Sequence, residues 1–331
     1  MRSVKKVRRG MVLGKFYPPH LGHLYLFDFA RNYVDELAVV VETERDQRVP
    51  GDMRFDWVRE LCPQHGVKVL HLTDENPQSP SEHPDFWNIW KRSLQRLLPW
   101  QPDFIFASED YGWKLAEVLN ATFIPVDPNR TVMPISGTEI RNHPLKHWEY
   151  LTRPARPFFA KRVCVFGPES TGKSTLATNL ARHFKTCFVP EYARAHLEPR
   201  NGQIQPADIE MIARGQIASE DALARNANRI LIVDTDLLTT CIWSHWMFGE
   251  CPDWVEEEAR KRTYDLYLVT DVDVPWVQDS VRYLPHERQS FLDQCLNTLQ
   301  QHQRPWKLIS GDWENRFQMA VRETESLLES G

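Results

Sequence analysis

The segment Gly167–Thr175 places the strongest constraint on how this chain of 331 residues can fold. Its sequence, GPESTGKST, fits the pattern G-x-x-x-x-G-K-[ST], and it lies between an apolar run at 161–166 and apolar residues at helical spacing over 176–184. A strand, a glycine-rich turn and a helix in this order form a phosphate-binding loop, because backbone N–H groups and the helix N-terminus then face the anion. A turn that binds nothing is the competing interpretation, and the flanking strand and helix argue against it.

The side chains of this loop suit a nucleoside triphosphate. We expect Lys173 to reach the outer phosphates and Ser174 to hold Mg²⁺. The other loop residues expected to contact ATP are Gly167, Glu169, Ser170, Thr171, Gly172 and Thr175.

The composition is typical of a soluble globular protein of about two domains. The net charge of -5 gives no general attraction to nucleic acid, and no apolar run approaches the ~20 residues that span a bilayer. Six cysteines are scattered without a C-x-x-C pair or metal-ligand spacing. Together with the lack of a membrane-spanning run, this predicts a reducing, cytoplasmic location without membrane insertion. The basic residues near the N-terminus, expected to form a solvated end of the chain, are Arg2, Lys5, Lys6, Arg8 and Arg9.

A second strand, turn and helix open the chain. Residues 10–16 predict a strand, 21–30 a helix and 36–42 another strand, which together make a βαβ unit. His20 and His23 are three residues apart at the start of the helix and therefore share one face. Two imidazoles at a helix N-terminus can donate to charge that develops on a transferred phosphorus.

The run Gly14–His23 is similar to the G-x-F-x-P-x-H-x-G-H signature of the nucleotidyltransferase superfamily, with two prolines where the short pattern has one. Residues 135–141, ISGTEIR, match the second signature of that superfamily, I-S-x-T-x-I-R. The resemblance implies catalytic roles for His20, His23 and Arg141. The further contacts to ATP or substrate that we expect from the two runs are Gly14, Lys15, Phe16, Ser136 and Thr138.

Polar residues also follow the predicted strands at 36–42 and 103–108, where ligands of open parallel sheets bind. Trp87 and Trp90 lie in a helical run after a proline-rich loop, and Trp87 is a candidate to stack on a planar ring. For all of these, an ordinary surface or core role is the competing interpretation. The polar candidates are Arg45, Asp46, Ser108, Glu109 and Tyr111.

Acidic residues end two predicted strands of the second half. We expect Asp234 to order Mg²⁺ and Glu191 to take the proton of an acceptor hydroxyl. Asp236 is the reserve for either role, and interchanged roles remain open. Arg282 and Arg288 follow a further strand and suit a lid over the transferred phosphoryl group, although a solvated helix face also explains them.

The expected fold is α/β, with two domains that are each a mostly parallel sheet flanked by helices. A Rossmann-like nucleotidyltransferase domain is expected over residues 1–150, and a P-loop kinase-like domain over 161–331. The proline-containing stretch at 151–160 is the expected linker.

Along essentially its whole length the chain resembles the NadR-type family, whose members join nicotinamide-nucleotide adenylyltransferase to ribosylnicotinamide kinase. The resemblance implies that ATP phosphorylates nicotinamide riboside in the second domain, and that the mononucleotide, NMN, attacks a second ATP in the first domain to give NAD and pyrophosphate. It also implies that Trp276 stacks on nicotinamide and that Asp279 and Arg282 lie near the substrate or the transferred phosphate. The segments that carry it are the two signatures, the phosphate loop, and residues 108–112, 191–194, 234–239 and 276–282.

Some family members begin with a helix-turn-helix domain, which needs more than the roughly dozen residues before the first strand, so we expect no DNA partner. The resemblance does not determine whether the chain forms a homo-oligomer. It also leaves open whether the substrate carries the amide or the acid form of the pyridine. Two other functions also stay open. One is a two-headed transferase for another phosphate acceptor, such as a pantetheine-type or nucleotide-type substrate. The other is a nucleotide-sensing partner of a transporter or repressor, against which the catalytic residue types argue.

Overall fold

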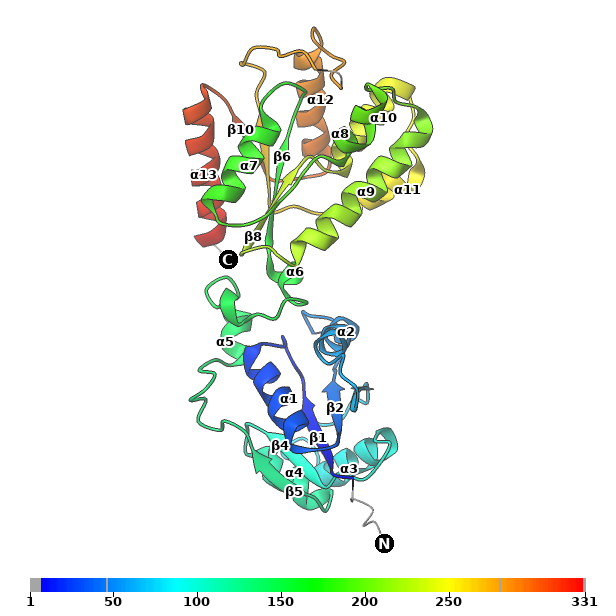
Figure 1. Ribbon diagram of the computed structural model, residues 1–331, viewed down its shortest axis with the longest axis vertical. Helices are drawn as coiled ribbons and strands as arrows, with labels where there is room; N and C mark the ends of the chain where they lie inside the picture. The colour runs from blue at the N-terminus through cyan, green and yellow to red at the C-terminus, as the bar shows by residue number, and fades with distance from the viewer. Residues whose placement is uncertain (1–6, 46, 280, 330–331) are drawn as a thin grey trace. The chain divides into compact units, whose positions relative to one another are not determined.

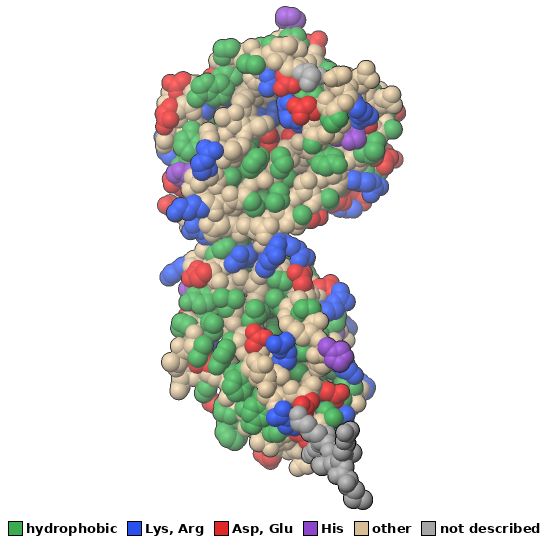
Figure 2. All heavy atoms as spheres, viewed as in Figure 1, with side chains coloured by type: hydrophobic (Ala, Val, Ile, Leu, Met, Phe, Trp, Pro, Cys, Tyr) green, Lys and Arg blue, Asp and Glu red, His purple; other side chains and the backbone are tan. Residues whose placement is uncertain are grey.

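The computed structural model describes residues 7–45, 47–279 and 281–329, so that Asp46 and the basic residues Arg2, Lys5 and Lys6 lie outside the described residues. The chain divides into two compact units, residues 1–155 and 156–331 (Figure 1). Positive and negative side chains are interspersed on the visible face of each unit (Figure 2). Within the described ranges, no helix is long and apolar enough to cross a membrane.

The first unit is built on a sheet of five parallel strands in the order β3-β2-β1-β4-β5. The strands are β1 (Arg9–Gly14), β2 (Glu36–Glu42), β3 (Val67–Leu72), β4 (Phe104–Ala107) and β5 (Thr122–Pro125). The helices are α1 (Leu21–Tyr33), α2 (Gly51–Leu61), α3 (Phe86–Leu97), α4 (Tyr111–Val118) and α5 (Gly137–Asn142), followed by a 3-10 turn, η1 (Trp148–Tyr150).

Both faces of this sheet are buried, because successive side chains of a strand point to opposite faces. Met11 and Leu13 of β1 pack in a cluster with α3 and α4, whereas Val12 packs in a second cluster with α1 and α2. The strand order reverses between β1 and β4, so the connections that leave the carboxyl ends of these two strands run in opposite directions and open a crevice there.

The second unit has the same architecture, with the strand order β10-β9-β6-β8-β7 and every pair parallel. Figure 1 shows α7 and α13 on one side of this sheet and α9 to α11 on the other. The strands are β6 (Lys161–Phe166), β7 (Phe188–Val189), β8 (Ile230–Asp234), β9 (Leu266–Thr270) and β10 (Trp306–Ile309). The helices are α6 (Arg156–Phe159), α7 (Lys173–His183), α8 (Tyr192–Leu197), η2 (Glu198–Arg200), α9 (Pro206–Ala224), α10 (Leu237–Phe248), α11 (Asp253–Lys261), α12 (Arg288–Gln301) and α13 (Trp313–Glu329).

The α/β fold class with two parallel sheets is confirmed. The boundary between the units falls within the stretch expected to be a linker. Its first residues belong to the first unit: Leu151 forms a backbone bridge with His20, and the Thr152 hydroxyl donates to the Pro19 carbonyl at 3.0 Å. The C-terminal end of this unit therefore fastens the turn that carries the first signature.

We predict that a fragment of residues 1–155 is more stable than one of residues 1–150. The shorter fragment loses the buried Leu151 and the hydrogen bond of the buried Thr152, worth together about 2 kcal/mol or more in free energy of unfolding. Urea unfolding followed by circular dichroism measures the difference. Equal midpoints for the two fragments would show that residues 151–155 do not support the turn.

Candidate active sites

A cavity of about 620 Å³ lies in the first unit at the carboxyl ends of β1 and β4. Of the residues that the sequence proposed for this unit, Arg45 is not in the lining: its side chain is 84% exposed and pairs with Glu75 at 3.2 Å. The candidate residues that line the cavity are Gly14, Lys15, Phe16, His20, His23, Trp87, Ser108, Glu109, Tyr111, Ser136, Thr138 and Arg141.

His20 and His23 cap the first turn of α1, each through its Nδ1 atom. His20 Nδ1 accepts from the Gly22 N–H at 3.1 Å, and His23 Nδ1 accepts from the His20 N–H at 3.2 Å. Gly22 is required for this geometry, since a Cβ there would lie 2.9 Å from the His20 ring. Because Nδ1 is an acceptor in both rings, the proton of each neutral imidazole resides on Nε2, which is left to donate to a ligand.

Burial keeps both imidazoles uncharged at neutral pH. It lowers the pKa of His20 to about 4, and the positive charge of Arg130 adds to the shift. The pKa of His23 also lies well below its ordinary value, because of burial first and then of its neighbours His20 and Arg130. The pair is therefore suited to hydrogen bonding with developing negative charge and not to neutralising it with a full positive charge.

Two arginines hold the turn after β1. Arg141 Nη1 donates to the Tyr17 carbonyl at 2.6 Å, and its guanidinium lies 4.6 Å from the centroid of the Tyr17 ring. Arg54, which is fully buried on α2, donates to the carbonyls of Lys15 and Glu42 and lies 5.1 Å from the same ring. Sequence reasoning missed Arg54, because its partners Lys15 and Glu42 are far from it along the chain.

The aromatic residues at the cavity differ in burial and in their hydrogen bonds. Both Trp87 and Trp90 line the cavity: Trp90 is buried and donates from Nε1 to the Pro77 carbonyl at 2.9 Å, whereas Trp87 is only partly buried. The Tyr111 hydroxyl donates to the Leu13 carbonyl at 2.7 Å, which fastens α4 to the end of β1. Of the two tryptophans of this run, Trp87 is therefore the more accessible to a ligand.

The phosphate loop of the second unit has the backbone that its glycines permit. Gly167 and Gly172 have φ values of 130° and 86°, which other residues adopt only with strain. A Cβ on Gly172 would also lie 2.5 Å from Trp313. Lys173 Nζ donates to the Pro168 carbonyl at 2.8 Å, so the lysine folds over the loop.

The three candidate acids of this unit have different surroundings. Asp236 caps α10 by accepting from the Thr239 N–H at 3.1 Å, and it also accepts from the Tyr267 hydroxyl at 2.8 Å. Asp234 is buried beside Ser174 and Lys173; burial and then the charge of Glu191 raise its pKa to about 6. Its Oδ1 atom has no hydrogen-bond partner among the residues that the structure describes. Asp236 thus uses its carboxylate to cap α10, whereas the Oδ1 atom of Asp234 can bind a ligand or a metal ion.

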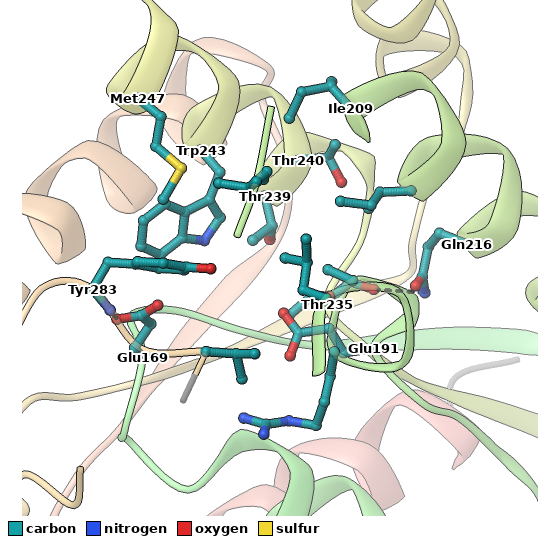
Figure 3. Close-up of a pocket in the computed structure, with 16 residues that line it drawn as sticks. Glu169, Glu191, Ile209, Gln216, Thr235, Thr239, Thr240, Trp243, Met247 and Tyr283 are labelled. Carbon is teal, nitrogen blue, oxygen red and sulfur yellow. Dashed lines mark hydrogen bonds between the residues drawn. The ribbon is translucent and has the colours of Figure 1, made fainter. Parts of the chain in front are cut away.

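A second, smaller cavity of about 70 Å³ lies beside the phosphate loop (Figure 3). Trp243 and Tyr283 form one side of it, with ring centroids 6.2 Å apart, and Glu191 lies on the other side. Glu169 of the phosphate loop also reaches this cavity and accepts from the N–H groups of Tyr283 at 2.8 Å and Leu284 at 3.1 Å. Glu169 therefore joins the phosphate loop to the segment that follows β9 and contains Tyr283 and Leu284.

The residues expected in a lid, Arg282 and Arg288, and those expected at the substrate, Trp276 and Asp279, all lie outside the lining of this cavity. Asp279 pairs with Arg194 at 3.0 Å and with Arg282 at 3.8 Å. Trp276 lies outside the lining, with the Arg288 guanidinium 5.8 Å from its ring centroid. Sequence reasoning missed the two aromatic residues of the cavity, because Trp243 lies inside an ordinary apolar helix and Tyr283 in a loop.

Two phosphate-binding strand–turn–helix sites, each on its own parallel sheet, define a nucleotidyltransferase-type unit followed by a P-loop kinase-type unit. A model of the cytidylyltransferase-like family matches residues 11–143, and a model of the AAA domain family matches residues 162–316. The chain is 30% identical over 342 residues to the "Trifunctional NAD biosynthesis/regulator protein NadR" of Escherichia coli strain K12, an alignment that covers 96% of this chain and 83% of the relative. The protein of the same name from Salmonella typhimurium strain LT2 gives the same identity and coverage. The chain therefore belongs to the NadR family.

Two solved structures have the same fold over nearly all of this chain. One is of a NadR protein in complex with NR, with a TM-score of 0.80 at 23% identity over 97% of this chain and 96% of that chain. The other is of a NadR protein in complex with NAD and AMP-PNP, with a TM-score of 0.79 at 22% identity over 98% of this chain and 96% of that chain.

We predict that the His20 ring of the ligand-free protein titrates near pH 4 and not near its unfolded pKa of about 6.5. Because the folded-state pKa is lowered, the unfolded chain binds the proton more tightly, and the first unit loses stability as the pH falls from about 6.5 to 4. Proton NMR of the imidazole C–H signals measures the midpoint, with assignments from the His20→Ala and His23→Ala variants. A midpoint near 6.5 would mean that the ring is not held as an acceptor by the Gly22 N–H.

Proposed function

We propose that the chain is a bifunctional enzyme of NAD biosynthesis. The second unit phosphorylates nicotinamide riboside with ATP, and the first unit transfers the adenylyl group of another ATP to the resulting mononucleotide, with release of pyrophosphate. The observation that carries the proposal is the presence of two complete phosphate-binding sites, of different types, in one chain of the NadR family. A cytoplasmic location, in which both nucleotides occur, belongs to the proposal.

In the kinase reaction, the 5′-hydroxyl oxygen of the riboside attacks the γ-phosphorus of ATP, and the bond to the β,γ-bridging oxygen breaks. Glu191 lies in the cavity beside the loop and accepts the hydroxyl proton, while Lys173 balances the charge on the phosphates. Asp236 is excluded from this role by its bonds to Thr239 and Tyr267. The reaction leaves ADP and the mononucleotide.

The surroundings of Asp234 fit Mg²⁺. Its buried Oδ1 atom has no hydrogen-bond partner within the described part of the chain, and Ser174 lies beside it, so the two would supply oxygen ligands of the kind that the ion prefers. Among the described residues no group of three His, Cys, Asp or Glu side chains gathers at one point, in keeping with an ion held largely by phosphates and water. When bound, Mg²⁺ would neutralise charge on the β- and γ-phosphates.

In the adenylyl transfer, a phosphate oxygen of the mononucleotide attacks the α-phosphorus of ATP, and the bond to the β-phosphate oxygen breaks. The Nε2–H groups of His20 and His23 donate to the oxygens that gain charge, with no covalent intermediate on the protein. Arg141 and the N-terminus of α5, capped by Ser136, lie at the same cavity. The product of the second unit is thus the acceptor for the first.

The nicotinamide ring is assigned to the side of the smaller cavity formed by Trp243 and Tyr283. Aromatic faces attract a cationic ring, and the acidic Glu169 and Glu191 add to the attraction for the pyridinium charge. This assignment replaces Trp276, which lies outside the lining.

The decisive test incubates the purified protein with ATP, Mg²⁺ and nicotinamide riboside and follows products by mass spectrometry. We expect NAD to appear through the mononucleotide. In the Lys173→Ala variant ADP formation falls by about a hundredfold or more while adenylylation of added mononucleotide persists, and in His23→Ala the reverse holds.

Each variant serves as the control for the other, because each lies in a different unit. Loss of both activities in either variant would show that the sites are not independent. Turnover with a different phosphate acceptor alone would favour the two-headed transferase for another substrate, and nucleotide binding without release of ADP or pyrophosphate would favour a sensor.

We predict that Trp243→Ala raises the KM for nicotinamide riboside about tenfold, because an aromatic face at the pyridinium is lost. Trp276→Ala, a change of the same size on the segment after β9, is expected to leave this KM within about twofold. Steady-state ADP release at saturating ATP measures both. The opposite ranking would return the nicotinamide site to Trp276.

A further inference from the structure

Arg316 of α13 is a buried charge that no step of the proposed reactions uses. The residue is 2% exposed, and burial of a guanidinium is unfavourable unless its N–H groups are satisfied. Nε donates to the Gly311 carbonyl at 2.9 Å, and Nη2 donates to the Asp271 carbonyl at 3.0 Å and to the Asp273 carboxylate. These acceptors belong to the loops that follow β9 and β10, so one side chain joins two strand ends.

The fourth contact of this side chain reaches the phosphate loop. Arg316 Nη1 donates to the carbonyl of Thr171 at 3.0 Å. That carbonyl shares its peptide plane with the N–H of Gly172, and in a trans peptide the two groups point in opposite directions. While the carbonyl is held toward Arg316, the Gly172 N–H points to the other side of the loop. Gly172 caps α7, so this is the direction in which the helix N-terminus meets a phosphate.

We infer that Arg316 is a positioning residue for the kinase site: it holds the Thr171–Gly172 peptide in the orientation that presents the Gly172 N–H to the phosphates of ATP. The inference rests on the kinase function proposed above for the second unit. Trp313, one turn before Arg316 on α13, packs over Gly172. The helix therefore contacts the Thr171–Gly172 peptide through two side chains. A planar guanidinium donates in several directions at once, whereas the single nitrogen of lysine cannot reach all four acceptors.

The test compares Arg316→Lys and Arg316→Met with the wild-type protein in two measurements. ADP affinity is measured by calorimetry, with the Lys173→Met variant as the reference for nucleotide bound elsewhere in the chain. ADP release gives the KM values for ATP and for nicotinamide riboside. We expect ADP affinity and kcat/KM for ATP to fall roughly tenfold or more in both variants, while the KM for the riboside and the adenylylation rate stay within about twofold.

Arg304→Lys is the matched control. Arg304 Nη2 also donates to three main-chain carbonyls of the second unit, those of Ala259, Arg260 and Arg262, but none of these belongs to the phosphate loop. This variant is expected to keep wild-type ADP affinity. Should it lose ADP affinity as the Arg316 variants do, their effect would be a general loss of packing and the inference would be wrong.

Asp273→Asn gives a second route that leaves Arg316 in place. It removes the carboxylate that faces the guanidinium and is expected to weaken ADP binding in the same direction but less. Folded Arg316 variants with wild-type ADP affinity would overturn the inference. Because calorimetry needs no acceptor, a wild-type protein that fails to phosphorylate nicotinamide riboside would count against the proposed function alone, while ADP affinity would still judge Arg316.

Discussion

Both units depend on one constraint: a helix N-terminus must face the carboxyl end of the central strand of a parallel sheet. β1 and β6 each occupy the middle of five strands, and in each unit the strand order reverses beside them. The turn that leaves each strand therefore opens into a crevice, where free N–H groups of the next helix meet an anion. The rest of each unit positions that turn, through the caps of α1 and α5 in the first and through the glycines of the phosphate loop in the second.

Burial has opposite uses at the two sites. It keeps His20 and His23 uncharged, so that they donate hydrogen bonds while their other nitrogens hold the first turn of α1. It raises the pKa of Asp234 to about 6, whereas the positive charge of the nearby Lys173 lowers that pKa, as a bound cation would. Burial thus keeps the histidines neutral, so that they can donate hydrogen bonds, and it makes the ionisation of Asp234 depend on a nearby positive charge.

A buried arginine supports the phosphate-binding turn in both units. Arg54 of α2 donates to the Lys15 carbonyl in the first unit, and Arg316 of α13 donates to the Thr171 carbonyl in the second. In each case a guanidinium, nearly inaccessible to water, satisfies several main-chain oxygens and so fixes the peptides that border the ligand. The two arginines lie on helices at different positions in the order of elements of their units. They are therefore alike in what they do and not in where they lie in the fold.

The sequence by itself determined the two phosphate-binding turns, the strands and helices that flank them and the α/β class, because these follow from local patterns of glycine, apolar spacing and polar residues at strand ends. Most of the candidate residues of the first unit also line one cavity, although their roles stay predictions. Only the tertiary structure decided that Asp236 caps a helix, that Trp243 and not Trp276 borders the smaller cavity, and that Arg54 and Arg316 brace the turns. These facts depend on burial and on contacts between residues far apart in the chain, which no local pattern records.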